Sequence, residues 1–80
     1  MRLDKYLKTS RIIKRRTVAN EACDCGRVRV NEKVAKASYE VKPGDIISVT
    51  FGTRTVVFEV CDVSEHVGKE KAALMYRIIE

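Results

Sequence analysis

The sequence predicts an α+β fold in which an N-terminal helical pair packs on a small, mostly antiparallel sheet. Apolar residues recur at helical spacing in residues 2–9 and again in residues 16–25. After Gly26 the pattern changes to alternation, which is typical of a half-buried strand. A length of 80 residues suits one domain with a modest core. We therefore expect a single domain over residues 1–80.

Both helices are predicted from short apolar stripes. In residues 2–9, Leu3 and Leu7 are four apart and Tyr6 falls on the same face. The second helix is expected to end at Gly26, which is a natural left-handed helix terminator. Its apolar stripe consists of Val18, Ala19, Ala22 and Cys23.

Three strands are expected to follow the helices. Arg27-Val28-Arg29-Val30 alternates basic and apolar side chains. Residues 46–51 and 55–63 are rich in β-branched side chains and form a hairpin around Gly52-Thr53. Phe51 and Phe58 flank this turn, and we expect both in the core.

The remaining segments are read as turns, a loop and a mixed C-terminus. Asn31-Glu32-Lys33 and Pro43-Gly44-Asp45 are predicted turns, and residues 64–68 a polar loop. Residues 70–76 have helical composition, whereas residues 76–79 could equally close the sheet as a strand. The expected end of the fold is therefore a short helix or strand.

The positive charge of the chain is concentrated at one end. The formal net charge is +5, but residues 1–16 hold seven bases and one acid, which gives +6. Residues 17–80 hold nine bases and ten acids, which gives −1. Such a local excess indicates an anionic partner, with nucleic acid first and an acidic membrane surface second.

Several classes of protein are disfavoured by what the sequence lacks. No apolar run approaches the roughly 20 residues that a transmembrane helix needs, and the N-terminus does not resemble a signal peptide. The three cysteines are an odd number, so we expect reduced thiols and a cytoplasmic location. A metal site is not expected because the spacing does not fit; its imagined ligands are Cys23, Cys25, Cys61 and His66.

The candidate RNA-binding residues are basic side chains of the helical pair and the first strand. Five recur every three residues and would wind slowly around one side of a helix. Arginine is well suited to phosphate because its planar fork binds two oxygens at once. The candidates are Arg2, Lys5, Lys8, Arg11, Lys14, Arg15, Arg16, Arg27 and Arg29.

Two alternatives remain open for individual side chains. Arg27 and Arg29 would face outward if the intervening valines meet the core, but they could instead pair with Glu40 or Glu59. Tyr6 and Tyr39 could stack on bases, although the spacing of Tyr6 favours the edge of the core. We expect Asp45 to be a turn residue and the His66 side chain to be exposed to solvent. We expect no catalytic residue, cofactor or metal.

Four ordered motifs resemble a known RNA-binding family. They are Arg-Leu-Asp-Lys-Tyr-Leu at 2–7, Gly-Arg-Val-Arg-Val-Asn at 26–31, Lys-Ala-Ser at 36–38 and Val-Lys-Pro-Gly-Asp at 41–45. Together they are similar to the RNA-binding domain named after small-subunit ribosomal protein S4. The resemblance covers about residues 1–51, which leaves about residues 52–80 as an extension. It implies the fold predicted above.

The C-terminal motif resembles the tail of the heat-shock ribosome-binding proteins that carry this domain; it is Lys-Ala-Ala-Leu-Met-Tyr at 71–76. The chain as a whole is most similar to the RqcP/YabO-like family of ribosome-associated quality-control factors. The resemblance implies a monomeric cytoplasmic protein on a large ribosomal subunit obstructed by peptidyl-tRNA, contacting ribosomal RNA and tRNA. It further implies support of alanine tailing with an RqcH-like factor. Arg2 and Arg16 match the family's RNA-contacting arginines best, and Lys5, Arg11 and Arg15 are next.

Other functions stay open beside this one. The chain could be a heat-shock-type factor without a tailing role, an RNA-binding regulatory module or a peripheral membrane helix. Two positions also depart from the family pattern. Glu32 replaces the usual Gly, which predicts a different or looser turn, and Arg15 replaces a capping Ser or Thr.

Overall fold

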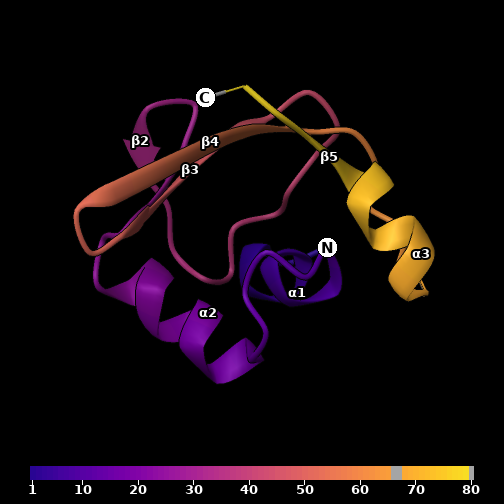
Figure 1. The fold of residues 1–80 in the computed structure, drawn as a ribbon. Helices are drawn as coiled ribbons and strands as arrows, with labels where there is room; N and C mark the ends of the chain where they lie inside the picture. Colours follow the sequence, from indigo (N-terminus) through magenta and orange to yellow (C-terminus); the bar gives the residue numbers. More distant parts are fainter. Residues whose placement is uncertain (66–67, 80) are drawn as a thin grey trace.

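The computed structural model describes residues 1–65 and 68–79. Two N-terminal helices lie under one side of a five-stranded sheet, and a short helical segment leads into the last strand (Figure 1). This is the predicted α+β fold. No helix within the described residues is long and apolar enough to span a membrane.

The two helices form where the apolar stripes predicted them. Helix α1 (Leu3–Thr9) buries Leu3, Tyr6 and Leu7. Helix α2 (Arg16–Asp24) buries Ala19, Ala22 and Cys23, but Val18 is exposed and does not belong to the stripe. Gly26 follows in the left-handed region at φ 77°, as expected of a helix terminator.

The sheet has the antiparallel order β2-β1-β3-β4-β5. Its central strands, β1, β3 and β4, were expected, although the last ends three residues earlier than predicted. The two-residue edge strand β2 falls partly in a predicted turn and was missed. The bounds are β1 (Val28–Val30), β2 (Lys33–Val34), β3 (Ile46–Phe51), β4 (Arg54–Val60) and β5 (Tyr76–Ile78).

The turn between β1 and β2 is tight despite Glu32. Val30 pairs with Lys33, which leaves only Asn31 and Glu32 in the loop. Both have positive φ, at 51° and 71°, as a primed two-residue turn requires. The expectation of a looser turn was therefore wrong, and Glu32 adopts a conformation that normally favours glycine.

The core lies between the helices and the inner face of the sheet. Val28, Val49 and Phe58 are fully buried there together with the apolar residues of α1. The ring of Phe58 stacks on Tyr6 with centroids 6.5 Å apart. Phe51 was expected in the core, but it ends β3 and its side chain is 43% exposed.

The C-terminal segment combines both predicted alternatives. A short helix α3 (Lys69–Ala72) continues into the 3-10 turn η1 (Ala73–Met75), and β5 then pairs with β4. Met75 is buried, and its carbonyl accepts a hydrogen bond of 2.8 Å from the Tyr6 hydroxyl. This bond ties the segment directly to α1.

Candidate nucleic-acid interface

Asp4 organises the N-terminal basic residues, although it is the lone acid among them. Its side chain is only 2% exposed. Its Oδ1 accepts hydrogen bonds from Arg2 Nε at 3.1 Å and from the Lys5 backbone N–H at 2.9 Å. Its Oδ2 accepts from Arg16 Nε at 3.4 Å and from Asn20 Nδ2 at 3.2 Å. One carboxylate thus joins the ends of both helices.

These contacts keep Asp4 ionised. Burial by itself would raise the pKa of Asp4. The hydrogen bonds from Asn20 and the Lys5 N–H, with the positive charges of Arg16 and Arg2, outweigh burial and lower that pKa. The two guanidinium groups therefore have a permanently charged anchor at neutral pH.

Arg2 and Arg16 are held rather than fully exposed. Their side chains are 46% and 49% exposed, and both contact the buried carboxylate of Asp4. A guanidinium has five N–H donors, and the contacts to Asp4 use two from Arg2 and one from Arg16. The remaining donors can bind phosphate oxygens from a fixed position.

The other N-terminal bases do not follow one helical stripe. Helix α1 ends at Thr9, and Arg11 has a left-handed φ of 65°, so Arg11 and Lys14 lie in the connection between helices. The three-residue spacing is therefore not a helical arrangement there. Lys8 and Arg15 are also exposed, which places four side chains in contact with solvent.

Lys5 differs from its neighbours. Its side chain is partly buried, and its Nζ lies 3.3 Å from a carboxylate oxygen of Glu65. Part of its charge is therefore compensated within the protein. Among the predicted N-terminal bases, Lys5 is the weakest candidate for an RNA contact.

Arg27 and Arg29 form a second basic surface. Val28 and Val30 face the core, so the arginines project from the side of the sheet opposite the helices. Neither forms an ion pair within residues 1–65 and 68–79; Glu40 instead binds the N-terminal amine and Glu59 binds Arg77. The alternative of paired arginines was therefore wrong.

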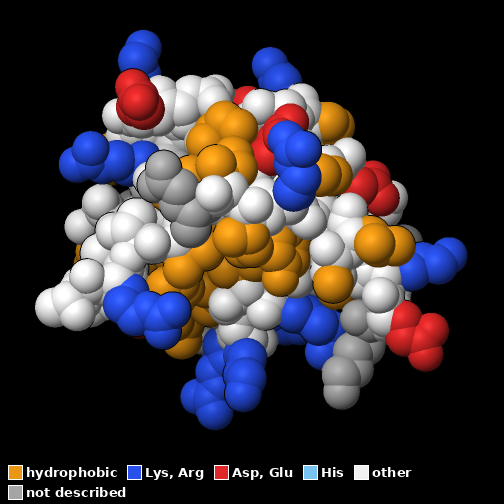
Figure 2. Space-filling model, turned by 45° about the horizontal axis from the view of Figure 1, so that its top comes forward, with side chains coloured by type: hydrophobic (Ala, Val, Ile, Leu, Met, Phe, Trp, Pro, Cys, Tyr) orange, Lys and Arg blue, Asp and Glu red, His pale blue; other side chains and the backbone are white. Residues whose placement is uncertain are grey.

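The sheet-side arginines line a shallow polar hollow of about 400 Å³. Hydroxyl-bearing side chains from β3 and β4 complete the lining, and the hydroxyls of Thr50 and Thr55 are hydrogen-bonded to each other at 3.3 Å. Its lining residues are Gly26, Arg27, Arg29, Ser48, Thr50 and Thr55. In the view from the top of the fold, Lys and Arg side chains surround a mainly apolar centre (Figure 2).

The arrangement thus comprises two basic surfaces rather than one extended face. The helix-end surface contains Arg2, Arg16 and the exposed bases of the connection, and the sheet-side surface contains Arg27 and Arg29. Sequence reasoning missed the anchors Asp4 and Asn20 and the hydroxyls of the hollow. The only available signal was the position of one acid among seven bases.

The remaining candidates have structural roles. Cys23 is buried, and burial raises the pKa of its thiol to about 11, so it is a poor nucleophile or metal ligand. Within the described residues no cluster could hold a metal ion; His66 lies outside them. Tyr6 is fully buried, and Asp45 accepts the Lys42 N–H in the predicted turn.

Comparisons with known proteins agree with this geometry. The S4 domain family model matches residues 1–47. The RQC P-site tRNA stabilizing factor of Bacillus subtilis is 51% identical over 80 residues, which cover 100% of this chain and 93% of the relative. The factor of the same name from Streptococcus pneumoniae is 51% identical over 79 residues, covering 99% and 90%.

A solved structure extends the likeness to three dimensions. The trimeric structure of Vibrio cholerae Heat Shock Protein 15 superposes with a TM-score of 0.90 at 30% sequence identity. The match covers 99% of this chain and 81% of that protein. The arrangement of helices, sheet and C-terminal segment is therefore shared with a heat-shock protein.

Proposed function

The chain belongs to the family of RQC P-site tRNA stabilizing factors and carries an S4 domain, and from this membership we propose that it is a non-enzymatic RNA-binding factor. It acts in ribosome-associated quality control on the large ribosomal subunit that is obstructed by a peptidyl-tRNA. There it contacts ribosomal RNA and the tRNA. The observation that carries this proposal is the pair of guanidinium groups anchored on Asp4.

The anchored arginines suit recognition of RNA by shape and charge. RNA duplexes present phosphates and 2′-hydroxyls, whereas their major groove is too narrow for side chains to read. Arg2 and Arg16 come from the starts of different helices, yet Asp4 fixes their relative position. Because they are already ordered, binding phosphate costs less side-chain entropy than it would for free arginines.

The second basic surface supports contact with a second RNA segment. Arg27 and Arg29 project from the opposite side of the sheet. Two surfaces that face different directions suit a factor placed between ribosomal RNA and tRNA. In this proposal the helix-end surface binds one RNA segment and the sheet-side surface binds the other.

The experiment is co-sedimentation of the purified chain with large ribosomal subunits, with and without peptidyl-tRNA. We expect retention on the obstructed subunits, and at least tenfold weaker retention of Arg2→Ala or Arg16→Ala. Lys71→Ala removes one exposed positive charge from α3 and serves as the control. Undiminished retention of both arginine variants would contradict the proposal.

We further propose that the chain supports alanine tailing together with an RqcH-like factor. Deleting its gene should abolish C-terminal alanine tails on stalled chains, as detected by mass spectrometry. Persistence of the tails would instead favour the heat-shock-type alternative, which the likeness to Heat Shock Protein 15 supports. A cytoplasmic, ribosome-bound monomer is part of the same proposal, and light scattering on the purified chain measures the oligomeric state.

A further inference from the structure

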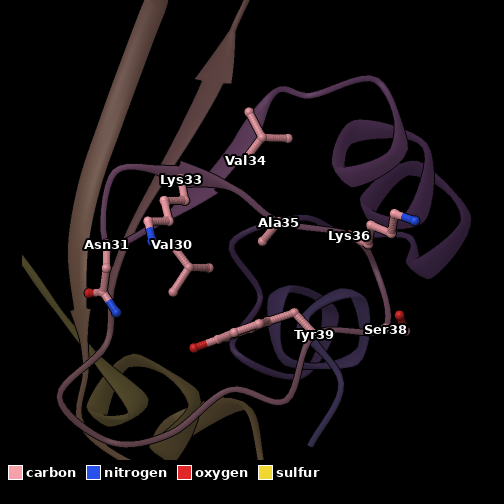
Figure 3. Close-up of a pocket in the computed structure, with 8 residues that line it drawn as sticks. All are labelled: Val30, Asn31, Lys33, Val34, Ala35, Lys36, Ser38 and Tyr39. Carbon is pink, nitrogen blue, oxygen red and sulfur yellow. The ribbon is translucent and has the colours of Figure 1, made fainter.

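A second hollow, of about 510 Å³, lies between β2 and the loop that follows it. Its volume falls within the range of small-ligand pockets, and none of the nine predicted basic RNA contacts lines it, although base stacking on Tyr39 was left open above. The lining residues are Val30, Asn31, Lys33, Val34, Ala35, Lys36, Ser38 and Tyr39 (Figure 3). Most of the exposed lining is apolar, with polar groups at its ends.

Tyr39 provides a fixed aromatic ring in this hollow. Figure 3 shows the side chain reaching across the hollow below Val30 and Ala35. The Tyr39 hydroxyl donates a hydrogen bond of 3.0 Å to Asp45 Oδ2, so the ring is held at its far end. Burial and the bond to Asp45 raise the pKa of Tyr39, which keeps the hydroxyl protonated. A half-buried, immobilised ring is a ready surface for stacking.

Positive charge lies at both ends of the hollow. Lys33 lies toward the end where the Tyr39 hydroxyl points, and Lys36 lies at the other end with its amine directed away from Tyr39 (Figure 3). Both are exposed, and none of the eight lining residues is acidic. Two acids lie nearby: Glu40 binds the N-terminal amine, and the Asp45 carboxylate accepts hydrogen bonds from the Tyr39 hydroxyl and from Asn31 Nδ2. The hollow therefore favours an anionic ligand that also has a flat apolar part.

The loop that lines the hollow is hydrogen-bonded to the start of α1, next to the helix-end surface. The backbone N–H of Leu3 donates to the Tyr39 carbonyl at 2.8 Å, and that of Asp4 donates to the Ala37 carbonyl. Residue 2 also forms an isolated bridge with residue 40. A strand of RNA that binds Arg2 thus has a direct path to the hollow.

We propose that this hollow binds one unstacked base of a single-stranded RNA segment, with the flanking phosphates at Lys33 and Lys36. Sequence-tolerant stacking on aromatic rings is the usual mode for splayed bases. Ser38 offers a hydroxyl to the base edge, whereas the Asn31 side chain is held in place by Asp45 and by the Ile46 backbone N–H. This inference rests on the proposed function in one respect: it takes the ligand to be RNA.

The ring is tested with two variants that both lose the hydroxyl. Tyr39→Phe keeps the ring and Tyr39→Leu removes it, so their difference isolates stacking from the bond to Asp45. The probe is a short single-stranded RNA with a central 2-aminopurine, whose fluorescence is quenched by stacking. We expect Tyr39→Phe to retain quenching, and Tyr39→Leu to lose it with at least about fivefold weaker binding. Equal binding and quenching by the two variants would overturn the inference.

The charges are tested at exposed positions, where folding is not at risk. Lys33→Gln/Lys36→Gln should lower the slope of log affinity against log salt by about 1.4, because two single-strand phosphate contacts are lost. The matched control Lys42→Gln/Lys71→Gln removes the same charge elsewhere and should leave the slope unchanged. Equal slopes for the two double variants would overturn the inference.

Spectra distinguish the ligand class and separate this inference from the proposed function. The single-stranded probe should shift the amide resonances of residues 31–39, and an acidic tyrosine-containing peptide should not. Preferential shifts with the peptide would assign the hollow to a protein partner. If the single-stranded probe does not shift these resonances while the chain still binds obstructed subunits, the proposed base site is refuted and the proposed function is not. The Arg2 and Arg16 variants test the proposed function separately.

Discussion

At the scale of single residues, Asp4 determines how the positive charge is presented. The spacing of the seven bases in the first sixteen residues predicted a basic surface along one side of a helix. The structure instead fixes Arg2 and Arg16 through one buried carboxylate. The contacts to Asp4 restrict the movement of both guanidinium groups, and each arginine side chain remains about half exposed. Asp4 therefore contributes to the proposed RNA binding by positioning the two arginines, although it is itself an acid.

Asp4→Asn tests the role of the anchor. We expect a loss of about 2 kcal/mol in the free energy of unfolding, as is typical of hydrogen bonds to charged groups. Binding to obstructed large subunits should also weaken, because both arginines lose their common partner. Urea unfolding and co-sedimentation measure the two effects. Asp24→Asn, which alters an exposed acid on α2, is the control and should change neither.

The same substitution should flatten the acid dependence of stability. The folded-state pKa of Asp4 lies below its ordinary value of 3.8. Its contribution to stability is therefore complete above that ordinary value, and is lost as the pH falls through the folded-state pKa. Urea titrations between pH 7 and pH 2 should show a smaller acid loss for Asp4→Asn than for the native chain. Equal losses of stability at acid pH in the two proteins would contradict a lowered pKa of Asp4 in the folded state.

At the scale of elements, local spacing predicted the helices and central strands because their buried residues are close in sequence. Edge strand β2 could not be predicted, since it has two residues and depends on a turn whose second residue, Glu32, normally disfavours positive φ. Likewise, Arg2 and Arg16 are fourteen positions apart, and no local pattern reveals their shared partner.

Arg15→Ser separates helix capping from charge. Arg15 occupies the N-cap position of α2 in an extended conformation, with no side-chain hydrogen bond to the helix. A serine there can accept a bond from the first turn and should stabilise the chain by about 1 kcal/mol. The same change removes an exposed base and should weaken RNA binding. Arg15→Ala should weaken binding without the gain in urea stability.

Glu32→Gly tests the strain in the β1–β2 turn. Glycine adopts a φ of 71° without the Cβ conflict of Glu32, although it gives up more chain entropy on folding. We expect a net gain of about 0.5–1 kcal/mol, measured by thermal unfolding. Glu32→Ala retains the Cβ and loses the charge, so it should not reproduce the gain. An equal gain from alanine would attribute the effect to charge instead.

At the scale of the whole molecule, the charge distribution predicts how binding responds to salt. An RNA site that uses about five phosphates should lose about 10²–10³-fold in affinity between about 50 and 200 mM salt. The slope depends on local contacts, whereas the net charge of +5 describes only the total. Lys8→Gln/Lys14→Gln and Lys42→Gln/Lys71→Gln lower the net charge equally, but only the first pair belongs to the basic N-terminal segment.

Comparing these two double variants decides between local contact and overall charge. If Lys8 and Lys14 touch phosphates, their loss should reduce the salt slope by up to about 1.8, while the other pair leaves it unchanged. Titration of labelled protein onto obstructed large subunits at several salt concentrations gives the slope for each variant. Equal reductions of the salt slope in the two double variants would mean that the total charge of the chain attracts it to RNA. An affinity of the native chain that does not change with salt would exclude phosphate contacts as its source.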